Sequence, residues 1–175
     1  VEPESDEPVI DDYAAGIKDA FVKKIVLGKF DKNNDGKIDA AEAEAITELD
    51  FTDCELEDGD LAGLESLPVK KLLLSGNRFT EFDILAWPAL EWINLNNNRL
   101  TSLSVGTKTA DLKQPLHLEA ANNQISTFTV PSYAKANIKY LDLSNNSVSK
   151  FPYDYVYGWS DLEYFNLSNN KLTKL

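Results

Sequence analysis

The sequence predicts an α/β fold in which a small helical cap leads into a right-handed solenoid with one parallel, concave sheet. Two observations carry this prediction. Six segments after residue 45 share one pattern of apolar residues, and the apolar residues before residue 31 recur at helical spacing. We expect an acidic, flexible leader over residues 1–12, the cap over residues 13–45 and the solenoid over residues 46–175.

The leader is acidic and contains two prolines. Six of its twelve residues are Asp or Glu, a composition that favours an extended, solvated segment, although a frayed terminus would look the same. The chain starts at Val1 and contains no methionine. We therefore expect either a processed product or a trimmed piece of a longer chain. Removal of an upstream signal peptide would make it an extracytoplasmic, secreted or cell-surface protein that a lipid could anchor.

The cap begins with a predicted helix that ends where an acidic loop starts. Its apolar face is formed by Val22, Val26, Leu27 and Phe30. Residues 31–42 then read DKNNDGKIDAAE and fill every constrained position of a twelve-residue calcium loop. The expected ligands are the side chains of Asp31, Asn33 and Asp35, the carbonyl of Lys37, a water held by Asp39 and both carboxylate oxygens of Glu42. The alternative is an acidic turn that binds no metal.

This helix–loop–helix stretch resembles an EF-hand, which implies bound Ca²⁺. The exiting helix is expected to begin near Asp39, with Ile46 as its next apolar anchor. EF-hands usually occur in pairs and dockerins carry two copies, whereas no second loop of this spacing exists in the chain. The single copy therefore predicts a structural ion rather than a sensor.

The solenoid is predicted from six segments with apolar residues at offsets 0, 3, 5 and 10 and with Asn or Cys at offset 8. Offset 8 is occupied by Cys54, Asn77, Asn98, Asn123, Asn146 and Asn170, at spacings of 23, 21, 25, 23 and 24 residues. This pattern resembles leucine-rich repeats, which implies a short strand in each copy whose alternate residues point inward, and a ladder of stacked asparagines. Cys54 is interpreted as a buried structural residue. Between strands we expect 3₁₀ turns or extended segments, because the returns are short and contain prolines.

Alternation along the strands predicts which side chains face outward on the concave sheet. The offset-2 column is Glu48, Lys71, Trp92, His117, Tyr140 and Tyr164, and the offset-4 column is Asp50, Leu73, Asn94, Glu119, Asp142 and Asn166. The last four repeats provide the candidate ligand-binding residues Trp92, Asn94, His117, Glu119, Tyr140, Asp142, Tyr164 and Asn166. Aromatic rings beside carboxylates and amides suit a protein or a carbohydrate ligand. Alternatively, the rings stack on one another and stabilise the sheet.

Composition disfavours several classes of partner. The net charge is −12, which leaves no basic stripe for nucleic acid or an anionic membrane, and no apolar run reaches the length of a membrane span. A single cysteine rules out an internal disulfide. No Ser/His/Asp group, phosphate loop or zinc ligand set can be assembled, so we expect no enzyme.

With one cysteine, short repeats and an EF-hand-like cap, the chain resembles bacterial surface proteins of the internalin-like type, and this resemblance implies a non-enzymatic recognition or adhesion module. The alternative is a structural spacer or assembly domain of a larger surface protein. The sixth repeat reaches Leu175 without a polar closing segment. We expect further chain, a partner or a second copy to cover that end, the last giving a homo-oligomer.

Overall fold

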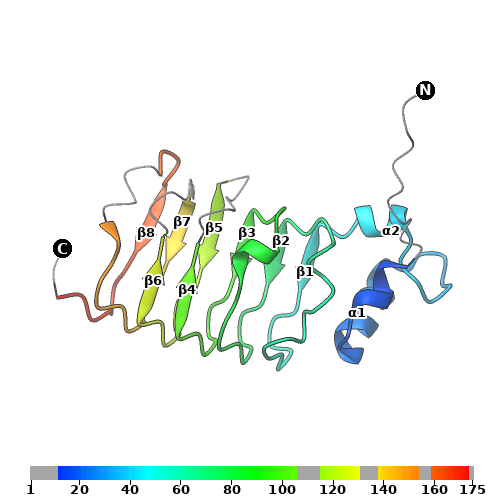
Figure 1. Cartoon of the computed structure of the whole chain (residues 1–175), viewed down its shortest axis with the longest axis horizontal. Helices are drawn as coiled ribbons and strands as arrows, with labels where there is room; N and C mark the ends of the chain where they lie inside the picture. Colours follow the sequence, from blue (N-terminus) through cyan, green and yellow to red (C-terminus); the bar gives the residue numbers. More distant parts are fainter. Residues whose placement is uncertain (1–11, 106–114, 131–137, 154–158, 174–175) are drawn as a thin grey trace.

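The computed structural model describes residues 12–105, 115–130, 138–153 and 159–173. The predicted leader therefore lies outside the described residues, except for Asp12. Helices gather at one end of the elongated molecule and strands follow one another along the rest (Figure 1). None of the described helices is long and apolar enough to cross a membrane.

Six strands form one parallel sheet, as the repeat pattern predicts. They are β1 (Glu48–Asp50), β2 (Lys71–Leu73), β3 (Trp92–Asn94), β5 (Leu116–Glu119), β7 (Ile138–Asp142) and β8 (Tyr164–Asn166). They pair in that order, each with the strand of the next repeat. The chain is thus a parallel-strand solenoid in which every turn adds one strand.

The returns between these strands contain short irregular elements, as expected. The 3₁₀ helix η2 (Ile84–Ala86) lies in one return, and strands β4 (Ser102–Ser104) and β6 (Thr127–Thr129) lie in the two that follow. β4 and β6 pair in parallel and form a second, two-stranded sheet, which the sequence pattern did not predict. Their central residues, Leu103 and Phe128, are buried in the core.

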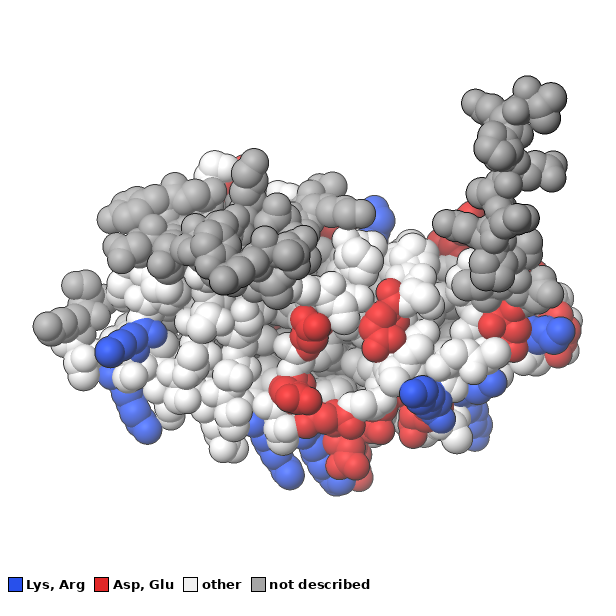
Figure 2. Space-filling model, viewed as in Figure 1, with Lys and Arg blue, Asp and Glu red and all other residues white. Residues whose placement is uncertain are grey.

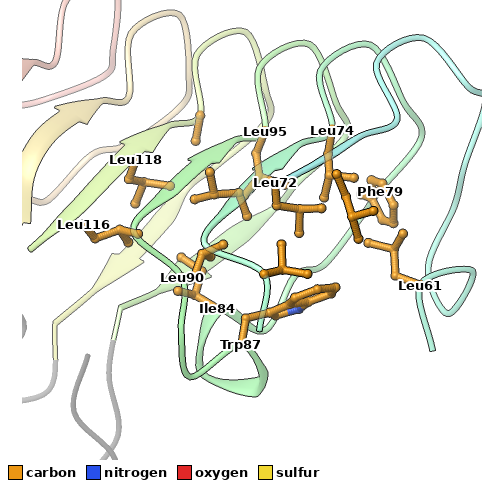
Figure 3. Close-up of a cluster of buried hydrophobic side chains, with 14 of the residues drawn as sticks. Leu61, Leu72, Leu74, Phe79, Ile84, Trp87, Leu90, Leu95, Leu116 and Leu118 are labelled. Carbon is orange, nitrogen blue, oxygen red and sulfur yellow. The ribbon is translucent and has the colours of Figure 1, made fainter. Parts of the chain in front are cut away.

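The core lies between the main sheet and the returns. Side chains from strands, such as Leu72 and Leu118, and from returns, such as Phe79 and Trp87, enter the same interior (Figure 3). One continuous apolar cluster joins cap and solenoid. Phe165 is the exception among the inward strand positions, since 40% of it is exposed on the last described strand.

A ladder of asparagines, buried at Asn77, Asn98 and Asn146 and partly buried at Asn123 and Asn170, links successive turns. The Asn98 side chain donates to the carbonyls of Leu74 in the preceding turn and Leu95 in its own, at 2.9 and 3.1 Å, and its Oδ1 accepts from the Phe79 amide at 3.1 Å. The same set of contacts recurs at Asn77, Asn123, Asn146 and Asn170. Each amide therefore satisfies backbone groups that the turn would otherwise leave buried and unpaired.

Two details of the ladder differ from the sequence analysis or extend it. Cys54 is only partly buried, because no earlier repeat covers it; its thiol lies 3.5 Å from the Thr52 carbonyl. The residue before each ladder position has a positive φ, and these residues are Asp53, Gly76, Asn97, Asn122, Asn145 and Asn169. Asn and Asp tolerate this left-handed conformation better than most residues, which explains the repeated Asn-Asn pairs.

The cap consists of three short helical elements. A 3₁₀ helix, η1 (Tyr13–Gly16), precedes α1 (Ala20–Phe30) and α2 (Ala40–Glu44). Asp19 caps α1 through the Val22 amide, and Asp39 with Glu42 forms a reciprocal capping box at the start of α2. Helices thus flank the acidic loop on both sides.

The cap contacts the first return of the solenoid through backbone groups. The Lys18 amide donates to the Ala62 carbonyl at 3.2 Å. A Cβ atom at Gly63 would lie only 2.0 Å from the Gly16 carbonyl oxygen, and Gly63 has a φ of +99°. Glycine is required there both by conformation and by the close approach of the two segments.

Asn98→Ala tests the ladder. The substitution leaves the Phe79 amide without its partner and removes one donor from each of two buried carbonyls. We expect the free energy of unfolding, measured by denaturant titration, to fall by about 2 kcal/mol. Arg99→Ala, at the exposed neighbouring position, is the control and should change it by less than about 0.5 kcal/mol. Equal effects of the two substitutions would contradict the ladder's role.

Candidate functional site

Four rings form one stacked column on the outer face of the main sheet. Strand register places Trp92 beside His117, His117 beside Tyr140 and Tyr140 beside Tyr164. Their ring centroids are 3.8, 3.9 and 4.2 Å apart, with interplanar angles of 18°, 9° and 8°. Neighbouring strands lie about 4.8 Å apart, so the side chains converge away from the backbone, as they do on a concave face. We call these four residues the aromatic column.

The column continues into the first repeats through charged residues. The Lys71 ammonium lies 5.3 Å from the Trp92 ring centroid and 3.2 Å from the Glu48 carboxylate. Trp92 and Tyr164, at the two ends of the column, are 38% and 40% exposed, whereas His117 and Tyr140 between them are half-buried. Each inner ring has both faces covered by its neighbours, so the column presents ring edges along most of its length.

The predicted polar residues lie beside the column but are already engaged. Glu119 accepts from the amides of Asn94 and Asn96 at 3.2 and 3.0 Å, and its other oxygen lies 2.9 Å from His117 Nε2. Asn96, at offset 6, was not among the predicted site residues. Alternation along the strand places Asn96 on the same face as Asn94, and this position was the signal that could have found it.

Asp142 and Asn166 form a second polar pair on the same face. The Asn166 amide donates to Asp142 at 3.3 Å, and each residue also accepts from a backbone amide two positions later, at Ser144 and Ser168. The eight predicted ligand-binding residues therefore share one surface. Their polar members partly stabilise the turns that follow the strands.

The acidic loop wraps its own backbone amides around its side-chain oxygens. Asp31 accepts from the amides of Asp35 and Gly36 at 3.2 and 2.9 Å, and Asn33 accepts from the amide of Asp35 at 2.9 Å. Asp35 accepts in turn from the Lys37 amide at 2.9 Å. Gly36 has a φ of +81°, as a sharp turn at this position requires. Carboxylate oxygens can accept further bonds, so these contacts do not exhaust them.

Glu42 closes the loop from α2. It is only 8% exposed, and it accepts from the amides of Lys32, Asn33 and Asp39 at 2.7, 3.4 and 3.1 Å. No ion pair compensates its charge in the described chain. Asp39 itself caps α2 through the Glu42 amide at 2.9 Å. A buried carboxylate without a cationic partner is unusual, and it is compatible with the chemistry of a calcium ligand.

The side chains are not gathered closely around one point. Among residues 12–105, 115–130, 138–153 and 159–173, no group of three or more His, Cys, Asp or Glu side chains has an arrangement that could hold a metal ion. The donor set of the loop nevertheless fits calcium by residue type and by the burial of Glu42. Calcium remains a prediction.

Ile38, in the middle of the loop, pairs with the segment before η1. Its carbonyl accepts from the Tyr13 amide at 2.9 Å, and its amide donates to the Asp12 carboxylate at 3.1 Å. The Ile38 side chain is fully buried. Asp12 and Tyr13 thereby satisfy the backbone groups that a second loop would satisfy in a paired EF-hand.

Comparison with known families identifies the repeat unit. Residues 137–157 match the family model described as Leucine Rich Repeat. This segment is a leucine-rich repeat. It contains β7 and Asn146, and the contacts of Asn146 recur in the neighbouring turns, so those turns share the architecture of this segment.

Among solved structures, the leucine-rich repeat chain is similar to one described as the crystal structure of the leucine-rich repeat domain of APL1B. The two are 24% identical, with a TM-score of 0.49. The match covers 68% of this chain and 32% of that chain, so it spans about a third of the longer protein. No match was found among curated proteins.

Tyr140 provides a pH test of the aromatic column within the leucine-rich repeat sheet. Burial, with Tyr164 and Asp142 nearby, raises the pKa of Tyr140 from 10.0 to about 12. A raised pKa in the folded state means that the stabilising contribution is complete below pH 10 and is lost as the pH rises towards 12. Denaturant titrations over this range should show that loss.

Tyr140→Phe shows whether the late ionisation belongs to Tyr140 or to another tyrosine. In a phenolate absorbance titration, we expect one tyrosine of the native protein to ionise late, and we expect this late step to vanish in Tyr140→Phe. Tyr13→Phe, in the cap, is the control and should keep the late step. A late step that persists without Tyr140 would contradict the assignment.

Proposed function

We propose that the chain is a recognition module that binds a protein partner on the outer face of its main sheet, with the aromatic column at the centre of the contact. Leucine-rich repeat solenoids generally use their extended sheet surface to bind proteins. The observation that carries the proposal is the unbroken row from Trp92 to Tyr164, whose two end residues are exposed large apolar side chains. Aromatic residues of this kind dominate the binding energy of protein interfaces.

The stacking favours a protein over a carbohydrate. A sugar ring binds an aromatic side chain through the ring face, but both faces of His117 and Tyr140 are covered. The remaining edges and the polar pairs around Glu119 and Asp142 suit the mixed apolar and hydrogen-bonding surface of a polypeptide. A carbohydrate could use only the outer faces at the ends of the column.

A structural role is the alternative function, and one observation favours it. Stacked rings and the Glu119 network join adjacent strands, so they stabilise the sheet whether or not a partner binds. A spacer or assembly domain needs no more than this. If the chain is a recognition module, loss of the aromatic column weakens binding. If the column is structural, its loss lowers stability.

Calcium is proposed as a structural ion of the cap. Asp31, Asn33, Asp35 and Glu42 would supply side-chain oxygens, with the Lys37 carbonyl and a water held by Asp39. The buried, uncompensated Glu42 supports this assignment. An ion there would add positive charge to a loop that holds only acidic and amide ligands, and it would fix α1 relative to α2. Extracellular modules bind calcium at about 10⁻⁴–10⁻³ M, which fits the proposed location at a cell surface.

Loss of the aromatic column tests the binding function. The double variant Trp92→Ala/Tyr140→Ala and the control Phe21→Ala, an exposed residue of α1, would be immobilised beside the unaltered chain. Proteins retained from cell-surface extracts by the unaltered chain and the control, but not by the double variant, would be purified and titrated by calorimetry. We expect the double variant to bind such a protein at least about tenfold more weakly.

Stability measurements on the same variants distinguish the two functions. A double variant that keeps its unfolding midpoint but loses the purified partner supports recognition. If instead the midpoint falls and every retained protein binds the double variant equally well, the column is structural and the recognition proposal is wrong.

Removal of calcium tests the cap. We expect chelation to lower the thermal midpoint of the unaltered chain, since an ion at a hundred times its Kd stabilises the fold by about 2.7 kcal/mol. Glu42→Gln keeps the size of the side chain but removes its charge. In this variant, chelation should no longer lower the thermal midpoint. Glu44→Gln, exposed on α2, should retain the effect of chelation. Unchanged midpoints and unchanged amide exchange in residues 20–55 after chelation would contradict the calcium proposal.

A further inference from the structure

A groove lies on the returns, away from the aromatic column. It has a volume of about 490 Å³ and is enclosed by three consecutive segments: residues 58–65 after β1, residues 79–87 after β2, and β4. Part of its wall is drawn in Figure 3, where Leu61, Phe79 and Trp87 lie near one another. Nothing in the proposed recognition function uses this groove.

Four carboxylates surround the groove, and no basic residue lines it. They belong to Asp58, Glu65, Glu81 and Asp83. Figure 2 shows acidic side chains gathered over the middle of this face, between β4 and the cap. In the described part of the chain, Lys or Arg pairs with Glu48, Glu55, Glu91 and Glu163, whereas none of the four carboxylates at the groove forms an ion pair.

The carboxylates are held in place by neutral donors. Asp58 accepts from the amides of Thr80 and Glu81 at 2.9 and 3.3 Å and from the Thr80 hydroxyl. Burial opposes the ionisation of Asp58, but these hydrogen bonds outweigh it and lower its pKa. Asp83 caps η2 through the Leu85 amide at 3.0 Å. Neutral donors leave the negative charge uncompensated, so the groove keeps its attraction for a cation.

The floor of the groove is aromatic. Phe82 stacks on Trp87, with centroids 6.3 Å apart and an interplanar angle of 18°, and Phe79 meets Phe82 edge to face. An apolar floor beneath charged rims matches a side chain that has a long alkyl stem and a positive head. Arginine and lysine have this chemistry, and a guanidinium can also lie over an aromatic ring.

We propose that this groove binds an arginine or lysine side chain from an extended segment of a protein partner. Charge complementarity selects the occupant, because the four carboxylates attract positive charge and the aromatic floor offers contact to an alkyl stem. A metal ion would use the carboxylates but would leave the aromatic floor without a partner. A second copy of this chain is disfavoured by its net charge of −12.

The test uses two short synthetic peptides of the same length. One carries two arginines separated by a leucine, and its twin carries citrulline, which is neutral and nearly the same shape, in place of both arginines. Titration of the whole chain would be followed by NMR through the indole N–H signals. We expect the arginine peptide to shift the Trp87 signal more than those of Trp92 and Trp159, which lie outside the groove, and the citrulline peptide to shift none of them.

Variants distinguish the groove from general attraction to an acidic protein. Glu65→Gln/Glu81→Gln removes two rim charges, whereas Glu48→Gln/Glu163→Gln removes two charges that lie outside the groove. We expect the first pair to weaken binding of the arginine peptide by about threefold to tenfold, and the second pair to leave it within about twofold. Equal weakening by both pairs, equal binding of both peptides, or no shift of the Trp87 signal would each overturn the proposal.

Discussion

The asparagine that follows each strand of the main sheet from β2 onward is the constraint on which the rest of this structure depends. A buried amide must find partners for both its nitrogen and its oxygen. Here it finds them on its own turn and on the preceding one, as Asn98 does with Leu95, Leu74 and Phe79. The distance between a strand and its asparagine therefore cannot vary. All variation in repeat length, from 21 to 25 residues, falls in the returns.

This fixed register explains why the sheet and its outer columns could be predicted from the sequence. Once the strand of each repeat is aligned on its asparagine, alternation decides which residues face outward, and Trp92, His117, Tyr140 and Tyr164 follow. The sequence left open whether the rings stack on one another or keep their faces free for a ligand. The outcome depends on the curvature of the sheet, which brings centroids to about 4 Å, and on the engagement of Glu119 by Asn94 and Asn96.

The returns and the cap were less predictable, because their contacts join residues with no shared pattern. The pairing of β4 with β6 and the groove beside β4 arise where consecutive returns meet, and the returns differ in sequence and length. In the cap, the calcium-loop pattern was clear from residues 31–42. The pairing of Ile38 with Asp12 and Tyr13 was not, because it links the loop to a segment outside the motif.

The close approach of Gly16 and Gly63 has a consequence for how the chain unfolds. Stacked repeats contact only their neighbours, so a solenoid ordinarily frays from either end. Here the backbone of the cap lies directly against the first return, and the apolar residues of α1 belong to the same cluster as those of β1. The cap and the first turns therefore form one cooperative unit. Residue 45 separates two sequence patterns, but one apolar cluster includes residues on both sides of it.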